Sequence, residues 1–508
     1  MKASIHHVFT IFIIAISIFI REACATDRSK MFRTVVTTDM EQDDLASLIR
    51  YLLYTNELDT QGIIYSSSRY HWAGDGNGTR FFLPNRSYTT PQWTYRWTGT
   101  RTIQDKVLKE YAEVYPNLIN HDPFYPTPDE LLSLVKVGNI DFEGEMGHDT
   151  DGSDLIRSLL LDDDSRPLYL QAWGGTNTIA RALKSIEEKY SGSKQWKQIE
   201  NKISRKAIIL ASGFQDETYA NYISLKWPRI RVEQLETGYQ TWGYNFDKGD
   251  GNVRGLPDDN LYFAGDWIKA NIETGPYGKL YRSWLDGQSM PGDPMDVFGN
   301  LSKANSSDQV FSPLGPYDFL SEGDNVVFNP LLTTGIENPA NPNLGGWGGR
   351  AEKNSSSPNL WLMVDSEKAQ NGTEISGYTT NRWIAAVQND FAARMQWTLT
   401  PDYTQANHPP SVKILNGTTV KCSPGDTLTL SSAVTDPDQN KVTISWWQFF
   451  EEGSYPGSVT VTKLSDNNAN IIIPADAKPG QNISIILQGT DDGSFPLTRY
   501  GRIFVQVI

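Results

Sequence analysis

Apolar runs of strand length alternate with helical segments through the first 400 residues of the chain, and this alternation limits the folds open to it. The run 31–36 predicts a strand, and the apolar residues of 45–52 recur at the i, i+3, i+4 and i+7 spacing of an amphipathic helix. The same patterns predict further strands at 62–68, 166–173 and 205–212, and further helices at 102–115, 127–135, 154–161 and 178–190. They predict an α/β domain with an open, mostly parallel sheet covered by helices on both faces.

The pattern changes after a last predicted helix at 382–397. Residues 401–408 form a polar, proline-bearing linker, and 409–508 contain short alternating runs separated by turn signals such as "SPGD" and "DPDQN". This spacing is typical of an antiparallel β-sandwich with an immunoglobulin-like or cadherin-like architecture. We therefore expect an α/β domain over 26–400, the linker, and a sandwich over 409–508.

The first 25 residues have the pattern of a secretory signal. Lys2 precedes an almost wholly apolar run from Val8 to Ile20, and the small residues Ala23 and Ala25 flank Cys24. The apolar run has 13 residues, which is too few to span a bilayer, and no later apolar stretch is long enough. We expect a secreted, extracellular protein with no membrane partner.

Net charge and cysteine content limit which partners the chain can bind and whether it can form an internal disulfide. Removal of the signal takes away a net charge of +1 and leaves −16, which repels phosphate backbones and argues against a nucleic-acid polymer as partner. Cys422 is then the single remaining cysteine, so no internal disulfide can form. Eight N-x-S/T sequons could carry glycans in a secreted eukaryotic chain, at Asn77, Asn85, Asn300, Asn305, Asn354, Asn371, Asn416 and Asn482.

An acidic cluster, "TTDMEQDD" at 37–44, follows the first predicted strand. Acids at a helix N-terminus favour the helix dipole and cap free amides, which accounts for Asp43 or Asp44. It does not account for Asp39 at the strand end. A hard cation would account for all three, because Ca²⁺ takes six to eight oxygen ligands.

The cluster resembles the D-x-D-x-x-x-D-D signature of the inosine–uridine-preferring nucleoside hydrolases, which hold Ca²⁺ at the end of the first strand. Here Thr37 stands at the first acidic position, and the other three acids are present. "WGGTN" is similar to the family's strand ending in G-P-L-T-N, and "SEGDNVVFNPLL" supplies a late aspartate, with Gly323 in place of the family's histidine.

Longer segments resemble one subgroup, described as cellulose-binding proteins with a nucleoside-hydrolase-like domain and a β-sandwich tail. "WGGTNT", "GGWGGR" at 345–350 and "AVQNDFAARMQW" carry this likeness, which extends over about residues 30–508 in the same order.

The resemblance implies a role for each matching residue. Asp39 would be a metal ligand and the general base for a calcium-activated water, and Asp43 would accept hydrogen bonds from sugar hydroxyls. The implied metal ligands are Asp39, Asp44, the Thr176 carbonyl and Asp324, and the implied substrate residues are Asp43, Asn177 and Asn221. In one branch of the family a histidine at the position of Gly323 protonates purine leaving groups. Its absence here puts purine cleavage in doubt. His71 and His148 lie in loops that could reach the site, although a structural role is the commoner one for a lone histidine.

The 15 tryptophans favour a second hypothesis. Trp347 lies between glycine pairs in "GGWGGR", so its indole could be presented to a sugar ring. The sequence leaves three candidate functions: a secreted Ca²⁺-dependent hydrolase of N-glycosyl bonds in a ribosyl substrate, a non-catalytic protein that binds cellulose or another carbohydrate, and a hydrolase of O-glycosidic bonds. The last needs a paired acid and base carboxylate, which the sequence does not identify. The retained metal positions favour the first.

Overall fold

The computed structural model describes residues 28–235, 261–293, 295–296, 298–301, 315–318, 322–368 and 374–508, so the predicted signal lies outside it. Within this part of the chain an eight-stranded sheet has the order β3-β2-β1-β4-β5-β6-β8-β7. Its strands are β1 (Phe32–Thr38), β2 (Leu58–Tyr65), β3 (Val135–Val137), β4 (Leu168–Ala172), β5 (Ala207–Ala211), β6 (Arg231–Gln234), β7 (Ala351–Lys353) and β8 (Leu360–Met363). Neighbouring strands are parallel except β7 and β8, which confirms the predicted α/β class.

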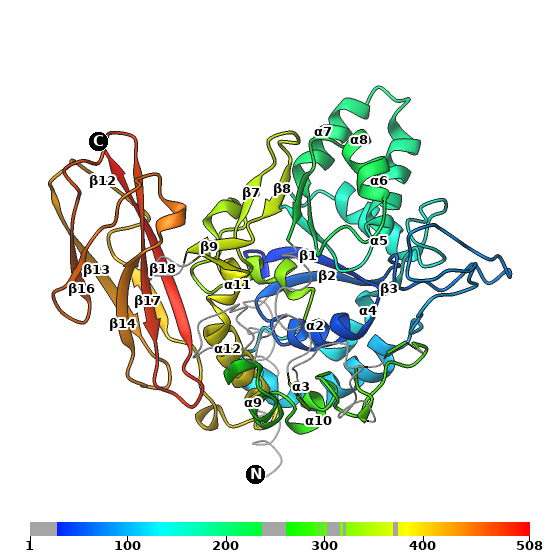
Figure 1. Ribbon diagram of the computed structural model, residues 1–508, viewed down its shortest axis with the longest axis horizontal. Coiled ribbons are helices and arrows are strands. Elements are labelled where there is room, and N and C mark those ends of the chain that lie inside the picture. Colours follow the sequence, from blue (N-terminus) through cyan, green and yellow to red (C-terminus); the bar gives the residue numbers. More distant parts are fainter. Residues whose placement is uncertain are drawn as a thin grey trace, which may run out of the picture.

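Helices cover both faces of this sheet (Figure 1). Helices in the described part of the chain include α2 (Gln42–Leu52), α3 (Leu108–His121), α4 (Pro128–Leu134), α5 (Asp151–Leu161), α6 (Asn177–Tyr190), α7 (Trp196–Lys206), α8 (Ser224–Lys226), α9 (Gly265–Asn271), α10 (Gly275–Gly278), α11 (Tyr378–Asn381) and α12 (Ile384–Trp397). Successive strand residues point to opposite faces. Val36 packs in one core with Leu48 of α2, and Val35 packs in the other with Leu183 of α6.

Short-range sequence patterns predict most of these elements. Thr127 caps α4 by accepting the Glu130 N–H, with Pro128 at the first helical position, close to the start of the helix predicted at 127–135. The helix predicted at 102–115 instead starts as a π-helical turn, η1 (Ile103–Val107), and continues as α3 to residue 121. The buried stripe of α3 runs on through Leu118, so packing outweighs the hydrogen bond lost at Pro116.

The C-terminal region forms two four-stranded sheets, in the orders β11-β13-β16-β15 and β12-β18-β17-β14. Their strands are β11 (Ser411–Ile414), β12 (Thr419–Cys422), β13 (Thr427–Thr435), β14 (Thr443–Gln448), β15 (Val461–Lys463), β16 (Asn468–Ile472), β17 (Asn482–Thr490) and β18 (Thr498–Val507). A smaller pair, β9 (Ser366–Lys368) and β10 (Glu374–Ser376), lies near α11. Pairing is antiparallel except between β12 and β18, which gives the predicted sandwich its own buried core.

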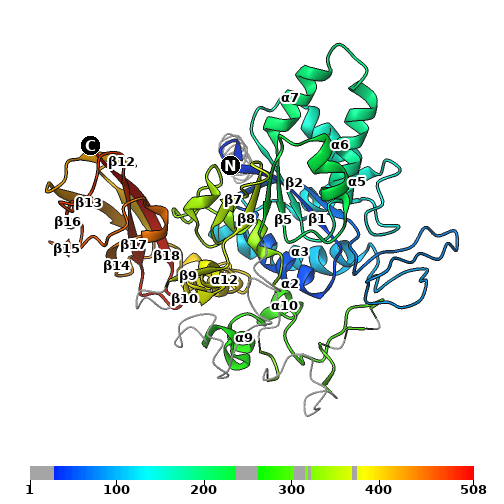
Figure 2. The same ribbon diagram turned by 45° about the horizontal axis from the view of Figure 1, so that its top comes forward.

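The sandwich lies beside α12 (Figure 2), and an ion-pair network joins it to the α/β domain there. Asp390 of α12 accepts hydrogen bonds from Arg499 of β18 at 2.7 Å and from Arg394 at 2.8 Å. Burial alone would raise the pKa of Asp390, but the two guanidinium groups hold it well below its usual range. The ring of Trp383 packs beside this network against Trp447 and Tyr500 of the sandwich.

We predict that Asp390→Ala lowers the free energy of unfolding by about 3–5 kcal/mol, because two buried arginines lose a charged partner. Since the folded pKa of Asp390 lies below the unfolded value, its contribution is present above about pH 4 and is lost as the pH falls further. Urea unfolding at pH 7 and in acid measures both effects. Asp466→Ala, in an exposed pair with Lys463, is the control and should change stability by less than about 0.5 kcal/mol. Equal stability of the two variants would contradict the prediction.

Candidate functional site

The turn between β1 and α2 holds the acidic cluster in a strained conformation. Met40 is buried and has a φ of +53°, in the left-handed region that is uncommon for residues other than glycine. Its N–H donates to the Thr38 hydroxyl at 3.0 Å, and its carbonyl accepts from the Thr98 hydroxyl at 2.9 Å. Such strain persists where neighbours enforce it and is frequent at functional sites. Carboxylate oxygens of Asp39 and Glu41 on either side of this residue lie within 4.8 Å of each other.

Four aspartates are buried around this turn: Asp39, Asp43, Asp44 and Asp324. Carboxylate oxygens of Glu41, Asp43 and Asp44 lie within 4.8 Å of one another. Burial and the neighbouring negative charges raise the pKa of each of the four aspartates, with Asp39 and Asp324 both acting on Asp44. A cation among them would remove this repulsion.

Some of these oxygens have no hydrogen-bond partner. Within the described part of the chain, neither carboxylate oxygen of Asp39 makes a hydrogen bond of ordinary geometry, and Oδ2 of Asp324 makes none. Asp44 is bonded on one side by the Thr38 hydroxyl. Buried charged groups without partners are costly, so these atoms fit the oxygen ligands of a hard cation such as Ca²⁺.

Asp324 reaches the cluster from a distant part of the sequence. Its N–H donates to the Ser47 hydroxyl of α2 at 3.3 Å, and the preceding Gly323 carbonyl accepts from Ser212 at 2.9 Å. A buried ion pair at 2.5 Å between Arg50 of α2 and Glu322 fixes the same segment. Asp324 is thereby tied to the carboxyl ends of the central strands.

Part of the cluster lines a polar pocket of about 420 Å³, while Asp39 and Asp44 lie behind its wall. Its lining includes Glu41, Asp43 and Asp324, together with the cations Arg69 and Arg96. Its position at the carboxyl end of a parallel sheet is the usual place for a ligand in this class of fold.

His71 and Glu41 form a bonded pair beside Asp39. Nε2 of His71 lies 2.5 Å from Glu41 Oε2, and Nδ1 lies 2.7 Å from the Arg96 carbonyl. Burial alone would lower the pKa of His71, but the Glu41 carboxylate raises it to about 9; burial alone would raise the pKa of Glu41, but His71 lowers it to about 2. Arg96, itself held by Asp293 at 2.9 Å, extends the pair toward the pocket. A structural role is the commoner one for a lone histidine, and the contacts of His71 are of that kind.

The "WGGTN" segment packs the end of β4 against the cluster. A Cβ on Gly174 would lie 2.8 Å from Cγ of Asp39, so only glycine lets the backbone approach the Asp39 side chain this closely. The Thr176 carbonyl accepts from Ala180 in the first turn of α6, and its hydroxyl lies 3.2 Å from Asp216. Asp216 also accepts the Asn177 N–H at 3.1 Å, which fixes the start of α6.

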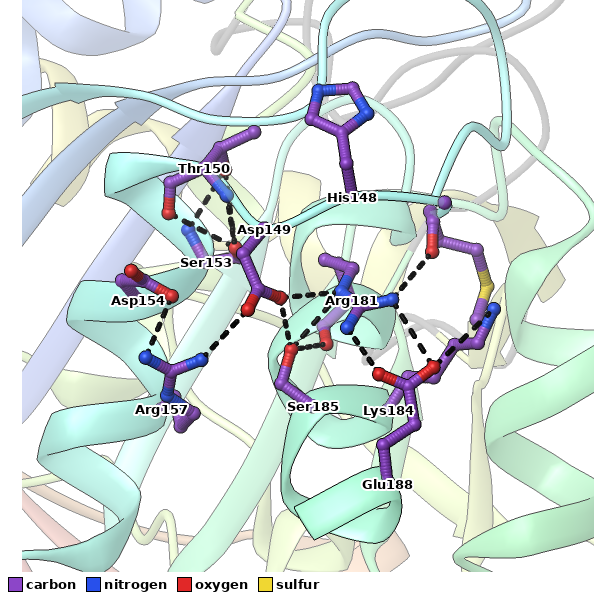
Figure 3. Close-up of polar contacts among 12 residues, drawn as sticks. His148, Asp149, Thr150, Ser153, Asp154, Arg157, Arg181, Lys184, Ser185 and Glu188 are labelled. Atoms are coloured by element: carbon purple, nitrogen blue, oxygen red, sulfur yellow. Dashed lines mark hydrogen bonds and ion pairs between the residues drawn. The ribbon is translucent and has the colours of Figure 1, made fainter.

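Asn177 binds protein groups on every side. Its side-chain amide donates to the Ser67 hydroxyl and to the carbonyls of Asn139 and Glu145, and its oxygen accepts from Ser66. The loop that carries Glu145 is fastened to α6 through Arg181, whose Nε donates to Asp149 at 2.7 Å (Figure 3). This network joins the ends of β2 and β4 behind the pocket.

The structure corrects three of the residues predicted at the substrate. Asn177 is buried with its hydrogen bonds satisfied, so it positions the loops instead. Asn221 is exposed on η2 (Tyr219–Ile223) and does not line the pocket. Trp347 is fully buried, with the guanidinium of Arg499 5.9 Å from its ring, so its indole face is covered by the sandwich side of the molecule.

Sequence reasoning missed the partners that shape the pocket. Glu41 was visible within the acidic cluster, and Asp216 follows a predicted strand, so both had a local signal. Arg96 and Asp293 had none, because they lie in loops about 200 residues apart that meet only in the folded chain. His148 is exposed beside Glu145 and does not line the pocket.

Two family models match the chain. The nucleoside hydrolase-like domain of the cellulose-binding protein Sde182 matches residues 33–351, and the C-terminal domain of the cellulose-binding protein Sde0182 matches 427–507. No curated protein matches. Among the described residues, no helix is long and apolar enough to cross a membrane.

One solved structure is similar to this chain over nearly its whole length. A nucleoside hydrolase-related hypothetical protein from Saccharophagus degradans, associated with carbohydrate metabolism, is 25% identical over 94% of this chain and 100% of that chain, with a TM-score of 0.67. A plant nucleoside hydrolase, PpNRh1, is 10% identical over 73% of this chain and 99% of that chain, with a TM-score of 0.31.

We predict that calcium stabilises the protein through this cluster. Calcium at about 100 times its dissociation constant should raise the free energy of unfolding by about 2.7 kcal/mol over the chelated protein. Asp324→Asn, which replaces a charged ligand by a neutral one, should reduce that gain, whereas the exposed Asp105→Asn should keep it. Thermal unfolding with calcium or with chelator measures the difference. An identical calcium response in Asp324→Asn and wild type would contradict the assignment.

Proposed function

The chain belongs to the family of cellulose-binding proteins with a nucleoside hydrolase-like domain, and from that premise we propose that it is a calcium-dependent hydrolase of N-glycosyl bonds in nucleoside-like substrates. The observation that supports this proposal is the buried, unpartnered carboxylate of Asp39 beside a polar pocket at the carboxyl ends of the strands. A structural carboxylate would be bonded to protein donors, as Asp216 and Asp390 are.

The proposed ion would be held by Asp39, Asp44, Asp324 and the Thr176 carbonyl. When bound, it supplies positive charge that keeps these carboxylates ionised and lowers the pKa of an adjacent water. Asp39 then acts as the general base, because its oxygens make no hydrogen bond of ordinary geometry to the described residues and can accept a proton. Asp43, which lines the pocket, accepts hydrogen bonds from the sugar hydroxyls.

The leaving group must depart with little acid assistance. Gly323 offers no proton where related hydrolases have a histidine, and its carbonyl is bonded to Ser212. His71 is buried with both ring nitrogens engaged, so it does not present a proton to the pocket. The proposal therefore favours substrates with good leaving groups over purine nucleosides.

Two further features belong to this proposal. We propose that residues 1–25 direct secretion, which agrees with the carbohydrate ligand named for the family. The second candidate function is cellulose binding without turnover. It is favoured by Gly323, which removes the expected acid, and by a separate aromatic cavity described below.

We predict that Asp39→Asn lowers the rate of nucleoside hydrolysis about 10²–10⁴-fold, because an amide is a poor proton acceptor. Product release from uridine and inosine, with calcium and with chelator, measures this rate. Asp466→Asn, at an exposed carboxylate on the sandwich, is the matched control and should hydrolyse at the wild-type rate. Hydrolysis that is unchanged in Asp39→Asn would refute the role of Asp39, and a wild-type protein inactive on every nucleoside would favour the binding function.

A further inference from the structure

A second cavity, of about 730 Å³, lies between α12 and one face of the sandwich sheet β12-β18-β17-β14. Both views show this sheet beside α12 (Figures 1 and 2). The cavity shares no lining residue with the acidic pocket and is larger than it. Its volume falls in the range of about 300–1,000 Å³ that is usual for small-ligand sites.

Small side chains on facing elements leave this space open. Ala385 and Ala386 form one wall on α12, and Ser445 of β14 belongs to the opposite wall. On the strands, residues two apart share a face, so Ser445 lies on the same side as Trp447, and Gln488 on the same side as Thr490. The sheet therefore presents a continuous row of polar and aromatic side chains to the cavity.

Aromatic rings from both domains line the cavity. Trp383 of the α/β domain and Trp447 of the sandwich have ring centroids 6.1 Å apart, and Tyr500 lies edge-on to Trp383 at 5.6 Å. The Trp447 indole N–H donates to Gln488 at 3.2 Å, and the Trp383 indole N–H donates to the Thr379 carbonyl at 3.1 Å. These hydrogen bonds fix both indole planes before any ligand arrives.

The polar groups of the cavity are nearly all neutral. Amides of Asn389 and Gln488 and hydroxyls of Thr490 and Thr498 line it, and no carboxylate does so among the described residues. Its single charged lining residue, Arg382, is paired with Glu367 at 3.2 Å. The acidic pocket, by contrast, is lined by three carboxylates.

This combination matches one ligand chemistry. A pyranose ring has C–H faces that pack on aromatic rings and equatorial hydroxyls that bond to amides and hydroxyls. An ionic ligand would gain little here, because the one guanidinium already has a carboxylate partner.

We propose that this cavity binds a chain of neutral, β-linked pyranoses such as a cello-oligosaccharide, on the partly exposed ring of Trp447, with Trp383 and Tyr500 in the cavity wall. The choice of glucan rests on the second candidate function, cellulose binding, whereas the position of the site does not depend on the metal cluster. The two domains would then form one carbohydrate site together, since neither supplies all the rings.

Calorimetric titration of the full-length mature protein with cellohexaose tests this site. Trp447→Ala should weaken binding by about 5–150-fold, the loss expected for one stacked aromatic ring. Trp93→Ala is the matched control, because Trp93 is 56% exposed and lines neither cavity. Ala386→Leu should also weaken binding, since it fills the cavity while every ring is retained.

The outcomes distinguish sugar binding in this cavity from hydrolysis in the acidic pocket. Binding should be equal with calcium and with chelator, below the unfolding temperature of the chelated protein. A requirement for calcium would place the sugar in the acidic pocket and overturn the inference. Three other results would overturn the inference. These are wild-type affinity in folded Trp447→Ala and Ala386→Leu, a loss of affinity confined to Trp93→Ala, and a wild-type protein that does not bind cellohexaose. Nucleoside hydrolysis is a separate readout, so its absence leaves this test intact.

Discussion

The burial of four aspartates around one strand end is the constraint on which the rest of the α/β domain depends. Asp39, Asp43, Asp44 and Asp324 repel one another, and burial raises their pKa values. Hydrogen bonds within the described chain do not offset this cost at Asp39. A ligand that supplies the missing charge would offset this cost, which is why we propose that the cluster holds a cation.

The surrounding structure holds that cluster in place from several directions. Met40 adopts a left-handed backbone, Gly174 admits the end of β4, and the pair formed by Arg50 and Glu322 delivers Asp324. The aromatic cavity lies elsewhere, at the junction with the sandwich, and is almost neutral. The molecule thus separates an acidic pocket suited to a cation and polar substrate from a ring-lined cavity suited to a sugar chain.

The sequence predicted the features that depend on neighbours along the chain. Strand–helix alternation predicted the parallel sheet, alternating runs predicted the sandwich, and the acidic cluster marked the pocket through Asp43 and Asp324. Features that depend on distant contacts were missed. Trp347 looked exposed between glycines but is covered from the sandwich side, and the ring-lined cavity forms only when Trp383 and Trp447 meet across two domains. Asn177 matches the asparagine of the family's motif, but its side-chain amide donates its hydrogen bonds to loop carbonyls.

A crystal structure of the mature protein grown with saturating calcium would reveal an ion in the aspartate cluster through its anomalous signal. We expect one ion with oxygens of Asp39, Asp44 and Asp324 at about 2.3–2.6 Å. Crystals grown in chelator should lose that peak while the sheet is unchanged. A cluster that holds no ion in saturating calcium, with the Asp39 carboxyl bonded to a protein neighbour instead, would contradict the account.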